Sequence, residues 1–317
     1  MVRWCWLKAT GGPSSAILRV DSFNVSFSER AAVVDVHRQH TAWLVEWSPT
    51  KENSMAIIGK VESLWRYPVK SMRGEELSEA FVGFAGVYGD RLFAFRSAGR
   101  PSGFPYLTGR EQMKMILYRP RFRHPDRAAK PPNLAEAESI EPGLSPIFAD
   151  SADLAVDVET PSGEVLSVDD PMLVRKLDEG LGDGHGLTLM RSERAMTDCR
   201  PVSLFSLQTG RRLGEELGIN LDKRRFRANV FMDLASTGGF AEDGFVGRML
   251  RIGSKTVVSI LERDPRCAMI SLDPDTAERN PAILGKVTKA HDGKAGVYGA
   301  VLIEGMVRTG DDIEVLD

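Results

Sequence analysis

From residue 56 onward the chain is built mainly of short segments rich in β-branched and aromatic residues, and this pattern constrains its fold most. Glycine, proline and charged residues separate the segments, as they separate strands in β proteins. The expected strands cover residues 57–67, 79–87, 91–97, 153–159, 164–168, 225–234, 248–252, 256–261 and 297–303, and residues 307–312 and 313–316 complete the chain. The segments 153–159 and 164–168 alternate apolar and polar residues around a turn, which predicts a hairpin.

Helical signals are confined to two segments. Residues 170–180 have a proline in the first helical position and a glycine after the end. Residues 206–217 have apolar residues at helical spacing, with Ser206 as a possible N-cap and Gly218 as a stop. Many short strands with few helices predict a β-rich α+β fold of the barrel type, and argue against a doubly wound parallel sheet.

The first 54 residues differ from the rest of the chain. They hold four of the five tryptophans and sustain no strand or helix period. Three basic residues and no acidic residue precede Asp21, a trait of transit peptides; the alternative is an upstream start codon, with Met55 as the biological beginning. At roughly 150 residues per domain, 317 residues suggest about two domains. The expected division is residues 1–55 as an extension that is disordered or a miscalled start, residues 56–178 as an N-terminal β domain, and residues 179–317 as a second β domain.

Three other segments carry weak patterns. Residues 121–146 contain many Pro, Ala and Glu residues, which indicates a mobile surface loop. The glycine-rich residues 180–186 follow a helix and precede none, so they indicate a flexible connection and not a phosphate-binding loop. His185 within them is expected to be solvated. Residues 277–294 show no clear period.

Composition excludes several functional classes. The formal net charge is −3, from 41 Lys and Arg against 44 Asp and Glu, so no general field favours nucleic acid or anionic membrane. Three cysteines, Cys5, Cys199 and Cys267, cannot form a disulfide scaffold or a four-cysteine metal site. No run approaches 18 apolar residues, which excludes a membrane span. We therefore expect a soluble, cytoplasmic, reduced protein that binds no nucleic acid.

Cys267 stands at the end of an expected strand, and two interpretations are open. A buried cysteine usually packs as an inert apolar residue. Arg263 and Arg266 nevertheless add positive charge, which lowers a thiol pKa and favours the thiolate, the form that binds soft metals. Pro265 and Pro274 place the cysteine at the edge of a loop, where functional sites concentrate.

Asp264, beside these arginines, is more often a salt-bridge partner than a proton donor. Asp273, in the segment Asp273-Pro274-Asp275-Thr276, is expected to cap backbone N–H groups in a turn.

Three short basic motifs lie at the ends of expected strands. They are Tyr67-Pro68-Val69-Lys70-Ser71, Gly89-Asp90-Arg91 and Phe226-Arg227-Ala228-Asn229. Each alone is typical of solvated charge. Together they offer three cations with hydroxyl and amide partners, a set that can bind a phosphate and a polar ring system.

These motifs, in this order, resemble the MOSC domain family with its N-terminal β-barrel companion, and within it the mitochondrial amidoxime-reducing component and its bacterial relatives. Further matches are Arg266-Cys267 followed by Asp273-Pro274-Asp275-Thr276, then Gly296-Val297-Tyr298 and Gly310-Asp311. The resemblance covers about residues 56–317. It implies a MOSC-type β-barrel domain packed with a smaller N-terminal β-barrel-like domain.

The resemblance also implies a molybdenum cofactor (Mo-molybdopterin), in which the pterin dithiolene supplies two sulfurs and the protein one thiolate. The matching thiolate is Cys267, the implied metal ligand and catalytic residue. The residues that match cofactor-binding positions are Lys70, Ser71, Arg91, Arg227, Asn229, Arg266 and Tyr298, with Ser206 and Thr209 at a helix start. Helix N-termini suit phosphate groups. The chain departs from the family at Ala228, often a proline, and at Pro265, commonly a serine, which removes a hydroxyl and a backbone donor.

The activity implied by the resemblance is reduction of the N–O bond of small N-hydroxylated substrates to amines or amidines. Because the chain lacks the cysteines of a ferredoxin domain, the electrons are expected from a separate electron-transfer protein or reductase. One alternative is a non-catalytic carrier of the molybdenum cofactor or of sulfur; another is a structural protein in which Cys267 binds nothing. Substrate choice is expected to depend on residues 121–146 and 277–294.

Overall fold

The computed structural model describes residues 56–140, 145–146, 150, 152–181 and 185–316. The expected N-terminal extension, residues 1–55, lies outside the described residues, as do residues 182–184 of the glycine-rich segment. The described residues all belong to one compact unit.

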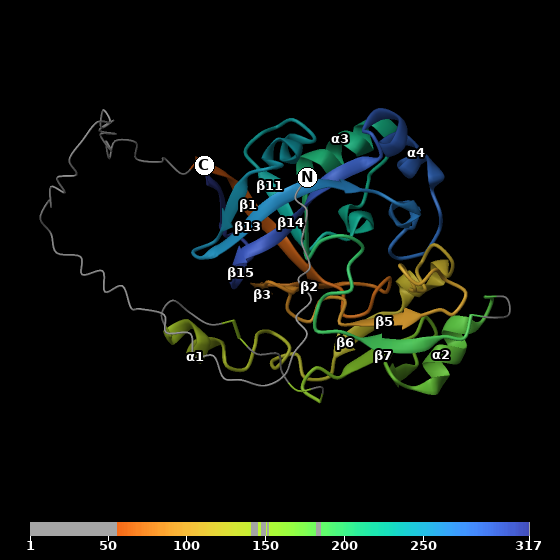
Figure 1. Cartoon of the computed structure of the whole chain (residues 1–317). Coiled ribbons are helices and arrows are strands. Elements are labelled where there is room, and N and C mark those ends of the chain that lie inside the picture. The colour runs from red at the N-terminus through yellow and green to blue at the C-terminus, as the bar shows by residue number, and fades with distance from the viewer. Residues whose placement is uncertain (1–55, 141–144, 147–149, 151, 182–184, 317) are drawn as a thin grey trace, which may run out of the picture. The chain divides into compact units, whose positions relative to one another are not determined.

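Seven strands close into a barrel in the order β11-β10-β14-β13-β12-β16-β1 (Figure 1), and pairing of β1 with β11 completes the ring. Only β10 and β11 pair in parallel; the other neighbours are antiparallel. The strands are β1 (Ala56–Arg66), β10 (Val202–Ser206), β11 (Val230–Leu234), β12 (Met249–Ile252), β13 (Thr256–Pro265), β14 (Lys294–Ile303) and β16 (Asp312–Leu316), and β2 (Glu75–Leu77) adds to the outer edge of β1. The expected β-rich fold of the barrel type is confirmed.

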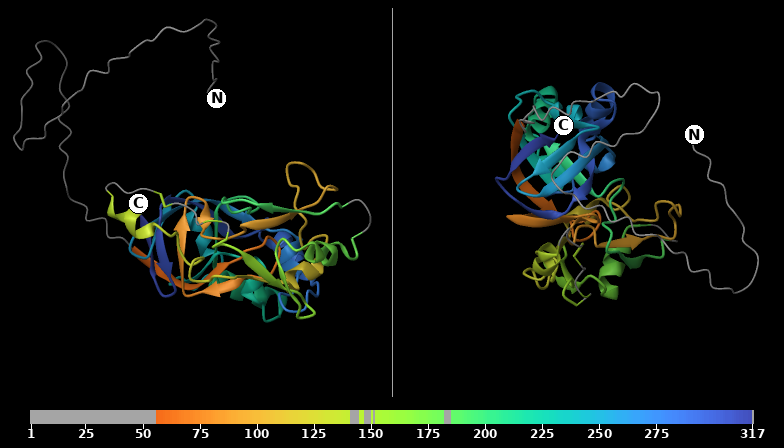
Figure 2. Two further views of the ribbon diagram at one scale, coloured as in Figure 1. Left: turned by 90° about the horizontal axis from the view of Figure 1, so that it is seen from below. Right: turned by 60° about the vertical axis from the view of Figure 1, so that its left-hand side comes forward.

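β1 comes from the N-terminal part of the described chain, whereas the other six barrel strands lie within residues 202–316. It is drawn in orange among the teal and blue strands in Figures 1 and 2. The contact with β11 is close: a Cβ atom at Gly59 would lie 2.4 Å from the carbonyl oxygen of Asp233. Glycine is therefore needed where β1 crosses β11.

Three smaller sheets lie outside the barrel. They consist of β3 (Glu79–Gly83), β4 (Gly86–Val87) and β15 (Gly305–Arg308); of β5 (Phe93–Arg96) and β9 (Thr188–Arg191); and of β6 (Arg119–Phe122), β7 (Val156–Glu159) and β8 (Val165–Ser167). β7 and β8 form the expected hairpin. One apolar cluster fills the barrel, with Leu204 and Leu250 among its members, and another, which includes Phe95 and Leu173, packs the region of the small sheets.

Both expected helices are confirmed. α2 (Pro171–Asp178) begins after the Asp170 cap. In α3 (Leu207–Leu217), the Ser206 side chain accepts from the N–H of Thr209, and Gly218 ends the helix in the left-handed conformation. Among the described residues, no helix has the length and apolar character to cross a membrane.

Two segments expected to be irregular contain helices among their described residues, so the expectation of no regular structure was wrong there. Residues 277–294 contain α4 (Pro281–Ala290), which has an Asn280 cap and buries Ile283 and Val287 one turn apart. Residues 121–146 contain the end of β6 and α1 (Leu134–Ser139), anchored by buried Leu134 and Ala137. The remaining helical turns are of 3₁₀ type: η1 (Met113–Leu117), η2 (Lys223–Phe226), η3 (Ala241–Phe245) and η4 (Ala268–Ser271).

Candidate functional site

One pocket, here called the Cys267 pocket, gathers most of the predicted site residues. It spans about 690 Å³ of space, part of which is open to solvent. The predicted residues that line it are Lys70, Ser71, Arg91, Arg227, Asn229, Arg266, Cys267 and Tyr298. Ser206 and Thr209 do not line it.

A short parallel pairing brings the first two motifs together. After β1, the N–H of Arg91 donates to the carbonyl of Tyr67 (2.7 Å), and that of Lys70 donates to the carbonyl of Phe93 (2.8 Å). Ser71, Arg91 and Arg227 all have positive φ, between 44° and 66°, although none is glycine. Six described non-glycine residues have positive φ, and three of them line this pocket. Such costly backbone is concentrated at functional sites.

The third motif lies where η2 meets β11. Arg227 ends η2, and its guanidinium carbon lies 4.3 Å from the centre of the Tyr67 ring. Asn229 is buried, and its side chain bridges two barrel strands by accepting from the N–H of Ser203 and donating to the carbonyl of Trp65, each at 3.2 Å. The asparagine thus shapes the pocket wall.

Cys267 follows β13 at the start of η4, and its side chain is half-buried. Its neighbour Arg266 donates to the carbonyls of Ala295 (2.6 Å) and Phe226 (2.8 Å) and pairs with Asp264 at 2.8 Å. The salt-bridge role expected for Asp264 is therefore confirmed.

Arg263, the second cation expected to act on the thiol, does not line the Cys267 pocket. Its guanidinium pairs with Asp243 at 2.8 Å and with Asp292 at 3.2 Å. Arg263 and Arg266 both precede Cys267 in the sequence. Of the two, Arg266 alone contributes charge to the pocket wall.

Asp264 is the most perturbed acid of the pocket. Burial raises its pKa to about 6, against the lowering effect of Arg266. The hydroxyls of Ser203 and Tyr298 hydrogen-bond to it, the former at 3.1 Å. Burial, and then the charge of Asp264, raise the pKa of Tyr298. A buried carboxyl and a phenol therefore lie together beside the cysteine loop.

The positive charge of Lys70 is balanced by an acidic residue of the protein. Its buried ammonium donates to the carbonyl of Met196 (2.8 Å) and pairs with Asp198, which also lies 3.6 Å from Arg110. Burial lowers the pKa of Lys70, and Asp198 offsets part of this effect. Burial alone would raise the pKa of Asp198, but Lys70 and then Arg110 hold it below its usual value.

Arg227 is the exception among the cations of the pocket. Lys70 and Arg110 pair with Asp198, Arg91 with Asp90, Arg225 with Asp273 and Arg266 with Asp264. Within the described part of the chain, the guanidinium of Arg227 has no ion-pair or hydrogen-bond partner. Burial lowers its pKa to about 10, so that it stays charged at neutral pH. An unpaired cation in a pocket favours an anionic ligand.

Ser206 and Thr209 form a separate buried cluster with Glu242. Both hydroxyls donate to the Glu242 carboxylate, at 2.7 and 2.8 Å, and all three residues are fully buried. The Glu242 carboxyl accepts these hydrogen bonds at the start of α3. The phosphate position expected at this helix start is thus filled by the protein's own carboxylate.

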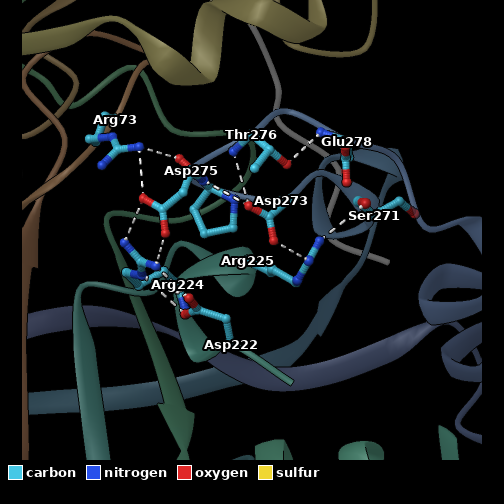
Figure 3. Close-up of polar contacts among 10 residues, drawn as sticks. Arg73, Asp222, Arg224, Arg225, Ser271, Asp273, Asp275, Thr276 and Glu278 are labelled. Atoms are coloured by element: carbon cyan, nitrogen blue, oxygen red, sulfur yellow. Dashed lines mark hydrogen bonds and ion pairs between the residues drawn. The ribbon is translucent and has the colours of Figure 1, made fainter. Parts of the chain in front are cut away.

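The loop after Cys267 is fixed by a network of ion pairs (Figure 3). Asp273 accepts from the N–H groups of Asp275 (2.9 Å) and Thr276 (3.0 Å), so its expected capping role is confirmed. Arg225, which lines the pocket, pairs with Asp273 at 2.7 Å and donates to the carbonyl of Ser271. Arg73 and Arg224 both hold Asp275.

The residues present fit a molybdenum cofactor. Among the described residues, no group of three or more His, Cys, Asp or Glu side chains could hold a metal alone. If Cys267 binds a metal, the dithiolene of the implied cofactor would supply further ligands. Unpaired Arg227 suits a phosphate, and the buried Nη2 of Arg266, which has no partner in the described chain, suits a polar ring.

Sequence reasoning missed several lining residues: Thr108, Arg110, Thr197, Asp198, Ser203, Arg225, Met269 and Ile270. The basic run 223–225 was a usable signal for Arg225, whereas the ion pair of Asp198 with Lys70 spans 128 positions and left no local trace. None of the described residues in 121–146 or 277–294 lines the pocket. His185 does not line it either; its Nδ1 lies 3.1 Å from the Ser97 hydroxyl.

Comparison with known proteins agrees with the fold. The family model described as the MOSC domain matches residues 191–314, and that described as the MOSC N-terminal beta barrel domain matches residues 58–130. No curated protein sequence matches the chain.

Several solved structures are similar to the chain. The YuaD protein from Bacillus subtilis is 14% identical, with 82% of this chain and 96% of that chain covered and a TM-score of 0.41. YiiM from Geobacillus stearothermophilus is 19% identical, with 37% and 55% covered and a TM-score of 0.29. YiiM from Escherichia coli is 13% identical, with 43% and 58% covered and a TM-score of 0.27. The two family matches together span more than half of the sequence, and the chain belongs to the MOSC domain family, whose domain is associated with molybdenum cofactor binding.

Proposed function

We propose that this protein binds the molybdenum cofactor in the Cys267 pocket and reduces small N-hydroxylated compounds. The observation that carries the proposal is one accessible thiol in a pocket lined by six cationic and two acidic side chains, with Arg227 unpaired. Cys267 would bind the metal, Arg227 the phosphate, and Arg266 a polar atom of the pterin. When bound, the cofactor supplies the two-electron chemistry that the reaction requires.

The protein's own groups account for binding and proton supply. Reduction of an N–OH group consumes two electrons and two protons and releases the amine or amidine and water. The electrons are expected from a separate donor protein. Asp264 holds a proton over part of the physiological range, because burial raises its pKa to about 6, and Tyr298 links it to the pocket wall. Asp264 is thus the best-placed proton donor.

The test is the molybdenum and pterin content of protein produced in a host that makes the cofactor, for wild type and Cys267→Ser. Cys199→Ser is the matched control, since Cys199 is exposed and does not line the pocket. We expect near-stoichiometric molybdenum in wild type and Cys199→Ser, and its loss or altered spectroscopy in Cys267→Ser. Molybdenum in none of the three would refute cofactor binding.

Turnover separates the enzyme from a carrier. Loaded protein supplied with a chemical reductant should convert an amidoxime to the amidine, and Asp264→Asn should slow this step without loss of molybdenum. A carrier would instead show no turnover and would pass its cofactor or a persulfide to an acceptor protein.

A further inference from the structure

A second cavity lies next to the Cys267 pocket, and of its lining residues only Arg227 has a role in the function proposed above. It encloses about 420 Å³, part of it open to solvent, and shares only Arg227 with the Cys267 pocket. Its apolar wall is formed by Trp65, Tyr67 and Ile116. Tyr67 and Ile116 are buried and Trp65 is half-buried, so Trp65 is the aromatic side chain of this cavity with surface left for a ligand.

The backbone at Gly74 passes close to the Tyr67 ring, and this close approach keeps the cavity open. A Cβ atom at Gly74 would lie 2.4 Å from Cε1 of Tyr67. Any larger residue at position 74 would therefore displace the ring that forms the wall.

The opposite side of the cavity is cationic. Three arginines, Arg73, Arg224 and Arg227, line it, and none of its lining residues is acidic. Figure 3 shows that the terminal nitrogens of Arg73 and Arg224 are directed toward Asp275, a residue outside the lining. The charges of Arg73 and Arg224 are thus balanced by an acid that lies outside the cavity lining.

Two donors have no acceptor in the described part of the chain. Nε of Arg73 is buried and unpartnered, and the Arg227 guanidinium lies over the Tyr67 ring without an acid. Leaving a buried donor unpaired costs free energy, so such groups call for a ligand or a water molecule.

We propose that this cavity binds a small planar aromatic carboxylate. The ring lies against Trp65, and the carboxylate accepts a hydrogen bond from Arg73. Aromatic walls favour a flat apolar ring, and guanidinium groups match carboxylate geometry. The site does not depend on a bound molybdenum cofactor.

Calorimetric titration of the full-length protein with three probes tests the ligand class. We expect benzoate to bind, neutral benzamide to bind at least roughly tenfold more weakly because it lacks the charge, and non-planar cyclohexanecarboxylate to bind severalfold more weakly. Absence of benzoate binding, or equal affinity for all three probes, overturns the proposal.

Variants of residues in and near the cavity test where benzoate binds. Arg73→Met should weaken benzoate roughly tenfold, whereas Asp275→Asn, which removes the acid that pairs with Arg73 and Arg224, should not weaken it. Arg110→Met, which alters only the Cys267 pocket, should leave benzoate binding intact. Equal losses in Arg73→Met and Asp275→Asn, or loss in Arg110→Met, would place the ligand elsewhere.

A second variant keeps the test decisive if Arg73→Met misfolds. Trp65→Leu should weaken benzoate and remove its advantage over cyclohexanecarboxylate. Molybdenum content should stay unchanged in this variant, which separates failure of this site from failure of the proposed function.

Discussion

At the residue scale, the clearest feature of the Cys267 pocket is an arginine without a counter-ion. Burial lowers the pKa of Arg227 from 12.5 to about 10, so the side chain stays charged at neutral pH, at a free-energy cost that the unfolded chain does not have. Replacing Arg227 by Met removes this cost and loses a cation–π contact with Tyr67. We expect Arg227→Met to raise the free energy of unfolding by about 1 kcal/mol and to weaken inorganic phosphate binding roughly tenfold.

Urea unfolding and calorimetric titration check this prediction. The matched control is Arg225→Met, which removes a paired pocket arginine and should lower stability, because Asp273 and the Ser271 carbonyl lose their partner. If Arg227→Met lost stability and kept its phosphate affinity, Arg227 would be a structural residue and not an anion-binding one.

Residues of the site could be predicted where they belong to one contiguous motif. They could not be predicted where their contacts join positions far apart in the sequence. Lys70, Arg91, Arg227 and Cys267 were found because each lies within a short motif, and the structure brings them to one pocket. The hydroxyls of Ser206 and Thr209 were assigned to phosphate because the helix start was visible in the sequence. Glu242, the carboxylate that occupies this start, lies 33 positions after Thr209, too far for local patterns to reveal.

At the element scale, the start of α3 depends on that buried carboxylate. Ser206→Ala removes both the N-cap and one donor to Glu242. We expect a loss of about 1–2 kcal/mol in the free energy of unfolding, with molybdenum per folded molecule unchanged. Thermal or urea unfolding beside metal analysis checks this. A loss of molybdenum with unchanged stability would instead assign Ser206 to the cofactor.

The loop that follows Cys267 should loosen in acid. Hydrogen bonds from Arg224 lower the pKa of Asp275 from its ordinary 3.8. Burial alone would raise the pKa of Asp273, but the N–H groups of Asp275 and Thr276 and the charge of Arg225 lower it. Groups with a lowered pKa stabilise the fold above the ordinary value, and this stabilisation is lost as pH falls through the folded-state pKa. The loop should therefore stay closed at pH 4 and open below it.

Hydrogen exchange measured by NMR tests this behaviour at the amides of Asp275 and Thr276. Their protection, relative to an unstructured chain at the same pH, should persist to about pH 4 and fall steeply below it. In Arg224→Met, protection should already be low at pH 5. Protection that is independent of pH in the wild type would contradict the role given to these ion pairs.

At the scale of the whole molecule, the class of fold followed from the sequence while the strand neighbours did not. Alternation and turn residues identified most barrel strands, because period-two burial leaves a local pattern. The pairing of β1 with both β11 and β16 joins residues more than 160 positions apart, and such contacts have no local signature. The sequence contains the signals of α4, namely its cap and its buried residues one turn apart. The helix was nevertheless not predicted, because its ten residues lie between two loops.

Because β1 completes a barrel whose other six strands lie within residues 202–316, the barrel should not fold from residues 179–317 alone. Residues 179–317 contain six of the seven barrel strands, and without β1 they would expose two unpaired edges, on β11 and β16. Open edges favour aggregation, and closure removes them. We expect a fragment of residues 179–317 to aggregate or to lack amide dispersion in NMR spectra, whereas residues 56–317 should fold and unfold cooperatively. A dispersed spectrum and a cooperative transition for the shorter fragment would show that β1 is dispensable for the barrel.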